Sequence, residues 1–290
     1  MNASSSSSVR HTPTTRSGPS FGRVLAAEWT KLLGLRSSVA IGVATVVVTG
    51  VLTHLFAGAA SGDPGFVPTR NLTDALPLAF LGPLVLGVLV GTGEFSTGSF
   101  RSTFAAVPRR VPVLAAQALV TAGFVLGVAV LTVGAAVLGI LPAAASRDVT
   151  PDLAGAGVPQ ILLGSVGHLV GTALLGLAIG VLLRRPVPAL VTAFVVVVIA
   201  PVVLSLAVDL ATGPPLEASA QGTTPPGTAV VNTVETFTPV GAGGVLTTPG
   251  GGGLDGAPDL GMPGAALVLA AWVTVPLAVA AYRLRRRDLA

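Results

Sequence analysis

Six long apolar segments, each without a charged residue in its interior, constrain the fold of this chain more than any other feature of its sequence. A helix needs about 20 apolar residues to cross a hydrocarbon core about 30 Å thick. In lipid the backbone must satisfy its own hydrogen bonds, which favours helices. The sequence therefore predicts an all-α integral membrane protein with six transmembrane helices. The expected spans are Ser38–Phe56, Ala75–Gly93, Val113–Leu141, Gln160–Leu183, Val187–Val208 and Gly264–Tyr282.

The composition agrees with a membrane protein. Only 10% of the residues are charged, against about 25% in a typical soluble domain. The net charge of +4 comes from basic residues beside the apolar segments, not from basic stripes interleaved with aromatics, so no nucleic-acid partner is expected. Cysteine is absent, which excludes disulfides and thiolate metal sites.

The distribution of Lys and Arg predicts the orientation. Fourteen of the 16 basic residues lie before the first span, between spans two and three, between spans four and five, or after the last span. These four regions share one side of a six-span chain, and the other side has only Arg70 and Arg147. Basic loops stay in the cytoplasm, so both termini are expected there. An alternative starts from Ala57-Gly58-Ala59, which resembles a signal-peptidase site, but the preceding apolar segment is longer and begins later than in signal peptides.

The part of the chain before the first span divides into two segments. Residues 1–20, with serines at positions 4 to 8, are expected to form a disordered cytoplasmic tail. Phe21–Leu35 carries apolar residues at helical spacing, including Trp29, with Arg23 and Lys31 elsewhere on the wheel. This pattern predicts an amphipathic helix in the membrane interface. It either anchors the chain at the surface or also contacts a cytoplasmic partner.

A long extracytoplasmic loop, residues 209–263, is expected before the last span. It contains several Gly and Pro clusters, which exclude long regular structure. Its more apolar middle, Thr228–Val240, could form short helices at the outer mouth.

Small and kink-forming residues recur within the spans. Three G-x-x-x-G pairs would allow close approach of helix backbones. Pro83, Pro201 and Pro276 are expected to bend spans two, five and six. The glycine pairs are Gly87 and Gly91, Gly167 and Gly171, and Gly176 and Gly180.

The sequence offers no catalytic, cofactor or metal site by motif. There is no phosphate-binding loop, and the single lysine is Lys31. Only His54 and His168 are ionisable within the spans, and His168 is expected to be a hydrogen-bonded interior residue. We therefore expect no enzymatic activity from the chain itself.

The segment from Gly93 to Arg110, which connects spans two and three, has features that a simple flexible connection would not need. Glu94 stands at the membrane exit, polar residues such as Thr97 follow as helix caps, and a short helix is expected before Pro108. Phe100 and Phe104 lie one turn apart, which suits docking into a partner.

These residues carry a resemblance to a known family. Glu28-Trp-Thr-Lys-Leu, Gly93-Glu-Phe-Ser-Thr-Gly-Ser-Phe-Arg, Ala106-Val-Pro-Arg-Arg110 and Tyr282-Arg-Leu-Arg-Arg-Arg-Asp-Leu resemble the permease subunit of an ABC-2-type ABC transporter. The resemblance covers nearly the whole chain after residue 20, as one six-span transmembrane domain.

The resemblance implies partners and coupling residues. A permease of this family pairs with a second copy or a paralogue, and each sits on a separate ABC ATP-binding subunit. The helices corresponding to Phe21–Leu35 and Thr97–Val107 contact that subunit, and the stretch before the last span often re-enters the membrane. The coupling residues implied here are Trp29, Lys31, Glu94, Thr97, Phe100, Arg101 and Phe104.

The leading hypothesis is thus a cell-membrane permease that is powered by ATP hydrolysed on a partner and exports its substrate. A secondary transporter is the first alternative, although it would need charged groups within the membrane. A membrane anchor or scaffold that transports nothing is the second.

Overall fold

All regular structure in the described part of the chain is helical. The structure is a computed structural model that describes residues 20–96, 110–155, 157–212 and 226–288. Six helical segments are long and apolar enough to span a bilayer, as predicted. The chain is a multi-pass membrane protein.

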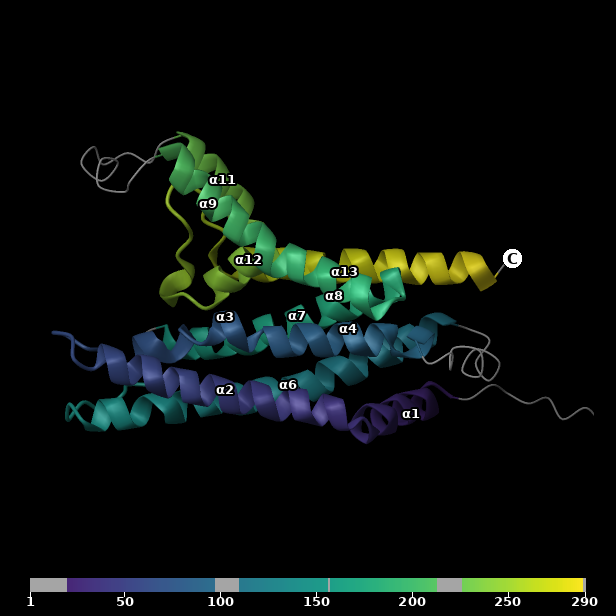
Figure 1. Ribbon diagram of the computed structural model, residues 1–290, viewed down its shortest axis with the longest axis horizontal. Helices are drawn as coiled ribbons and strands as arrows, with labels where there is room; N and C mark the ends of the chain where they lie inside the picture. The colour runs from purple at the N-terminus through teal and green to yellow at the C-terminus, as the bar shows by residue number, and fades with distance from the viewer. Residues whose placement is uncertain (1–19, 97–109, 156, 213–225, 289–290) are drawn as a thin grey trace, which may run out of the picture.

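Most of the spans run roughly parallel along the long axis of the molecule, whereas α9, the last part of span five, is inclined to it (Figure 1). Spans one, three and four are the helices α2, α6 and α7, and the last span is α13. Span two comprises η1, α3 and α4, and span five comprises α8, the π-helical turn η2 and α9. The bounds are α2 Arg36–Ala60, η1 Pro68–Thr73, α3 Leu76–Ala79, α4 Leu81–Ser96, α6 Arg110–Ala145, α7 Val158–Leu183, α8 Pro186–Phe194, η2 Val195–Ile199, α9 Ala200–Thr212 and α13 Gly261–Asp288.

Helix α2 buries small residues and directs large ones outward. In α2 the buried stripe is Ser38, Gly42, Thr45, Thr49, Thr53 and Ala57. The larger Val43, Val47 and Leu55 are exposed. Lipid tails are as apolar as a valine side chain, so close packing, not burial of apolar area, holds such helices together.

Two of the three G-x-x-x-G pairs face each other between α4 and α7. A Cβ on Gly87 or Gly91 would collide with the carbonyl oxygen of Ala173 or Leu177, and one on Gly176 or Gly180 with that of Leu84 or Val88. The backbones of α4 and α7 therefore pack directly together. The third pair behaves differently, because Gly167 faces open space and Gly171 meets only the side chain of Leu269.

Two of the three expected proline distortions interrupt their spans. Pro83 has no N–H for the carbonyl of Ala79, and the helix breaks at Phe80, between α3 and α4. Pro201 likewise leaves the carbonyl of Val197 without its usual donor, and the chain widens there into the π-helical turn Val195–Ile199. In contrast, α13 continues through Pro276.

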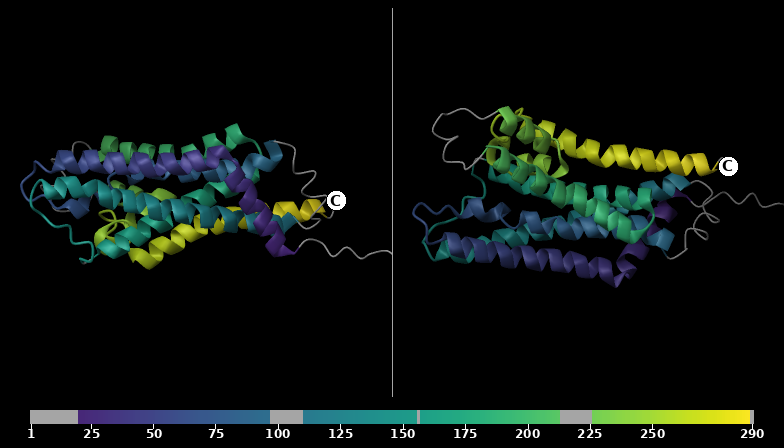
Figure 2. Two further views of the ribbon diagram at one scale, coloured as in Figure 1. Left: turned by 90° about the horizontal axis from the view of Figure 1, so that it is seen from below. Right: turned by 45° about the horizontal axis from the view of Figure 1, so that its top comes forward.

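The expected amphipathic helix is present as α1, Phe21–Gly34, but it is packed more closely than an isolated surface anchor. Figure 2 shows it inclined to α2 at the end of the molecule where α13 also ends. Val24 and Leu25 contact Val113 and Ala116 in the first turns of α6. The expected third span, Val113–Leu141, is longer than one crossing requires, and α6 is longer still because its first turns extend to meet α1.

The long loop contains two short helices, one that covers most of the predicted stretch Thr228–Val240 and one that begins at its end and continues beyond it. They are α11, Pro226–Thr236, and α12, Pro239–Leu246. Helix α12 packs against α7 and α13. Its Gly243 lies against the imidazole of His168, ten residues into α7. The segment thus reaches well into the helix assembly.

Candidate functional site

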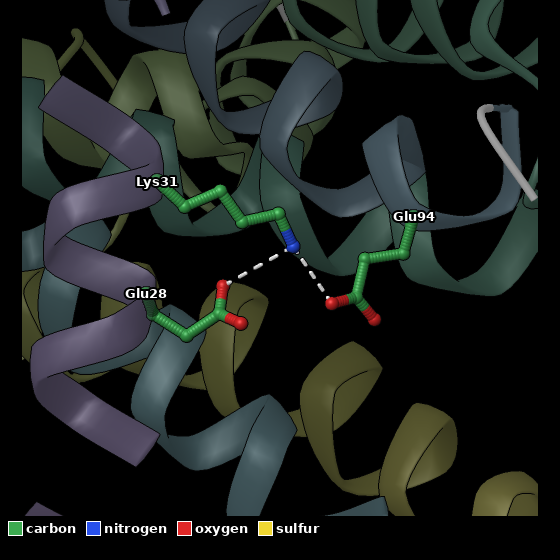
Figure 3. Close-up of polar contacts among 3 residues, drawn as sticks. All are labelled: Glu28, Lys31 and Glu94. Carbon is green, nitrogen blue, oxygen red and sulfur yellow. Dashed lines mark hydrogen bonds and ion pairs between the residues drawn. The ribbon is translucent and has the colours of Figure 1, made fainter. Parts of the chain in front are cut away.

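A cluster of charged side chains joins α1 to the end of α4 (Figure 3). Lys31 on α1 donates a 2.8 Å hydrogen bond from its Nζ to Oε1 of Glu94 on α4. The same Nζ lies 3.6 Å from Oε2 of Glu28, one turn earlier on α1. Gln117 on α6 completes the cluster, because its side chain lies beside Glu28 and Lys31 around the same small hollow.

The helical repeat places these groups. Val24, Glu28 and Leu32 recur at intervals of four residues and form the buried face of α1. Lys31 follows Glu28 by three residues, so it lies at the edge of that face and reaches across to α4. Glu94 is in the last turn of α4, directly after Gly93, and Gly93 lines the site together with Leu89 and Val90 of the same helix.

Both carboxylates are removed from water, whereas the ammonium is not. The side chains of Glu28 and Glu94 are 10% and 5% exposed, and that of Lys31 is 42% exposed. Burial raises the pKa of Glu28 above its ordinary value of 4.5; Lys31 and Gln117 oppose this shift, and the charge of Glu94 adds to it. Two carboxylates therefore compete for one ammonium.

A small hollow of about 40 Å³ adjoins the charged groups. Its lining includes Glu28, Lys31, Gly93 and Gln117, with apolar side chains from α1, α4 and α6 on the other sides. The hollow is a space beside the ammonium that no side chain fills.

The last turn of α4 is tied to a second element as well. The guanidinium of Arg184, at the end of α7, lies 5.1 Å from the centre of the Phe95 ring, within the range of a cation–π contact. Glu94 and Phe95 are neighbours in sequence, so α4 is linked to α1 by one residue and to the α7–α8 corner by the next.

The structure unites only part of the residues expected at the coupling site. It brings Lys31 and Glu94 into direct contact. Trp29 lies on a different face of α1, exposed, with its ring near Gly123 of α6. Thr97, Phe100, Arg101 and Phe104 lie outside the described residues, so their roles stay predictions.

Sequence reasoning assigned no role to Glu28 or Gln117. Glu28 stands in the quoted Glu-Trp-Thr-Lys-Leu motif, and its spacing from Lys31 is that of a helical ion pair. Gln117 is the first strongly polar residue inside span three. These two signals were present, but one sequence does not show which face of α1 meets α6.

The remaining candidate, His168, is a buried interior residue, as expected. Its ring stacks on Phe80 at 5.7 Å between ring centres and is hydrogen-bonded to the backbone of Gly243. Across the described ranges, no cluster of His, Asp or Glu could hold a metal ion.

Comparison with known proteins gives no family. No protein-family model matches the sequence, and no curated protein is similar to it.

Proposed function

We propose that the protein is the membrane-spanning permease of an ATP-driven exporter of the ABC-2 type, energised by a separate ATP-binding subunit in the cell membrane. The observation that carries this proposal is the Lys31–Glu94 contact between α1 and α4. It connects the two elements from which the resemblance implies contact with the ATPase: the helix before span one, and the segment that follows span two.

The contact gives a physical route for coupling. Glu94 stands three residues before Thr97, where the connection from span two to span three begins. A partner that displaces either α1 or this connection therefore acts on the Lys31–Glu94 contact at the end of α4. Helix α4 in turn is packed backbone to backbone against α7, so a movement of its end passes into the centre of the helix assembly.

The charge pattern supports the cytoplasmic placement of this site. Arg23, Arg36 and Arg185 are exposed residues near α1 or the α7–α8 corner. Helix α1 and the C-terminal end of α13 lie at the same end of the molecule (Figure 1), and the positive-inside rule favours the cytoplasmic side for the segments that carry these basic residues.

A groove between α7 and α13 suits the second permease copy or paralogue. It holds about 580 Å³ and opens on the apolar surface of the spans. Its floor includes Gly167, Gly171, Ala266 and Ala270. Small residues of this kind let a helix from another chain approach closely.

Affinity purification from the native cells in mild detergent, followed by protein identification, tests the proposal. We expect an ABC ATP-binding subunit in stoichiometric amount, together with a second permease chain. Recovery of the intact chain without any ATPase would contradict the proposal and favour a scaffold or a secondary transporter.

A further inference from the structure

The charged cluster contains one more carboxylate than a simple tie between two helices requires. Lys31 and Glu94 alone would join α1 to α4. Glu28 is nevertheless 3.6 Å from the same ammonium, buried, and beside Gln117. A buried carboxylate is unfavourable unless it is paired, so its presence beside an already paired lysine needs an explanation.

We propose that the Lys31 ammonium exchanges between two acceptors, Glu94 on α4 and Glu28 on its own helix. The lysine then keeps a carboxylate partner when α1 and α4 separate. Glu28 and Lys31 are three residues apart on one helix and move as a unit. When Glu94 leaves with α4, the alternative carboxylate stays within reach. The inference deepens the proposed function and rests on it for the partner that drives the separation.

The identity of the basic residue fits an exchange. Lys31 is the only lysine, and the other 15 basic residues are arginines. A guanidinium presents a rigid planar fork suited to one bidentate acceptor, whereas an ammonium is a compact charge on a flexible stem with three rotatable donors. Lysine is therefore the side chain that can turn from one carboxylate to another over a short distance.

The surroundings permit the movement. The hollow of about 40 Å³ beside the ammonium is bordered by Gly93, which has no side chain to fill it. Gln117 on α6 lies beside Glu28 in the lining of the same hollow, so the second acceptor has a polar neighbour that does not belong to α4.

The single lysine makes the exchange directly measurable. With ¹⁵Nζ-lysine and ¹³Cδ-glutamate labels in the full chain in lipid bilayers, solid-state NMR reports distances from one nitrogen to nearby carboxylates. In Glu94→Gln we expect Nζ to move onto Glu28. The measured distance from Nζ to Cδ of Glu28 should then shorten, because the N–O distance falls from 3.6 Å to about 2.8 Å. In Glu28→Gln the contact with Glu94 should remain, and in the double variant the dipolar contact should vanish.

Glu235→Gln provides the control, because Glu235 lies on α11, away from the cluster. The distances from Lys31 Nζ to the carboxylates of Glu28 and Glu94 should be the same in this variant as in the wild type. The exchange is refuted if Glu94→Gln loses all dipolar contact, because Lys31 has then turned to water. It is equally refuted if Nζ stays at its original distance from Glu28. The measurement needs no ATPase, so its outcome is independent of whether the chain is a permease.

Discussion

Lys31 and Glu94 lie 63 residues apart in the sequence, yet their side chains meet at 2.8 Å. The contact fixes a helix outside the spans to the last turn of a helix within them. Lys31 and Glu94 were predicted separately as coupling residues, and the structure shows them as the two partners of one interaction.

Removing one charge of this pair should loosen α1. Lys31→Met leaves two buried carboxylates without a cation, and breaking a buried pair typically costs about 3–5 kcal/mol. Because Lys31 is 42% exposed, we expect a smaller loss of about 1–2 kcal/mol in unfolding free energy. Denaturation in mild detergent measures it.

The matched variant is the exchanged pair Lys31→Glu with Glu94→Lys. It should recover at least half of the loss, whereas Lys31→Glu alone should be worse than Lys31→Met. Equal stability of wild type and all three variants would show that the pair does not hold α1.

The α4–α7 contact should tolerate no added side chain. Gly91→Ala places a methyl group against the carbonyl of Leu177, and overpacking of this kind costs about 1–3 kcal/mol. Gly127→Ala on α6 is the control, because nothing lies within 4 Å of its Cβ position. Melting in detergent should show a lower transition for Gly91→Ala only; equal melting would mean that these helices can move apart freely.

The pH dependence of folding stability should show the titration of Glu28. Its pKa is raised in the folded state, so the folded chain gains stability as protons bind it. That contribution is complete below the ordinary value of 4.5 and is lost as pH rises through the raised pKa. Glu28→Gln should therefore be more stable than wild type near pH 8, and the difference should shrink on acidification. Melting of both chains across this range measures it, and a constant difference would exclude titration of Glu28.

The orientation can be tested with single cysteines, because the chain has none of its own. Ser146→Cys and Asp63→Cys, on the predicted outer loops, should react with an impermeant thiol reagent in intact cells. Thr30→Cys on α1 and Arg185→Cys at the α7–α8 corner should react only after permeabilisation. Labelling of Thr30→Cys in intact cells would reverse the assigned orientation.

The six spans could be predicted because a long apolar segment has few stable structures open to it other than a membrane-spanning helix. Which face of each span is buried could not, since the periodicity that marks a buried face in water is weak where solvent is also apolar. In α2, threonine and glycine are buried while valine is exposed. The sequence suggested Lys31 and Glu94 as separate candidates, but only the packing of Val24 and Leu32 shows why they meet and why Glu28 joins them.

The most direct test of the account is ATP hydrolysis by the purified chain, alone and with its copurified partner, in lipid nanodiscs. We expect no hydrolysis by the chain alone. The complex should hydrolyse ATP, and Lys31→Glu should change its substrate-stimulated rate by more than about fivefold, with partial recovery in the exchanged pair. Hydrolysis by the isolated chain, or a wild-type rate from the Lys31→Glu complex, would contradict the account.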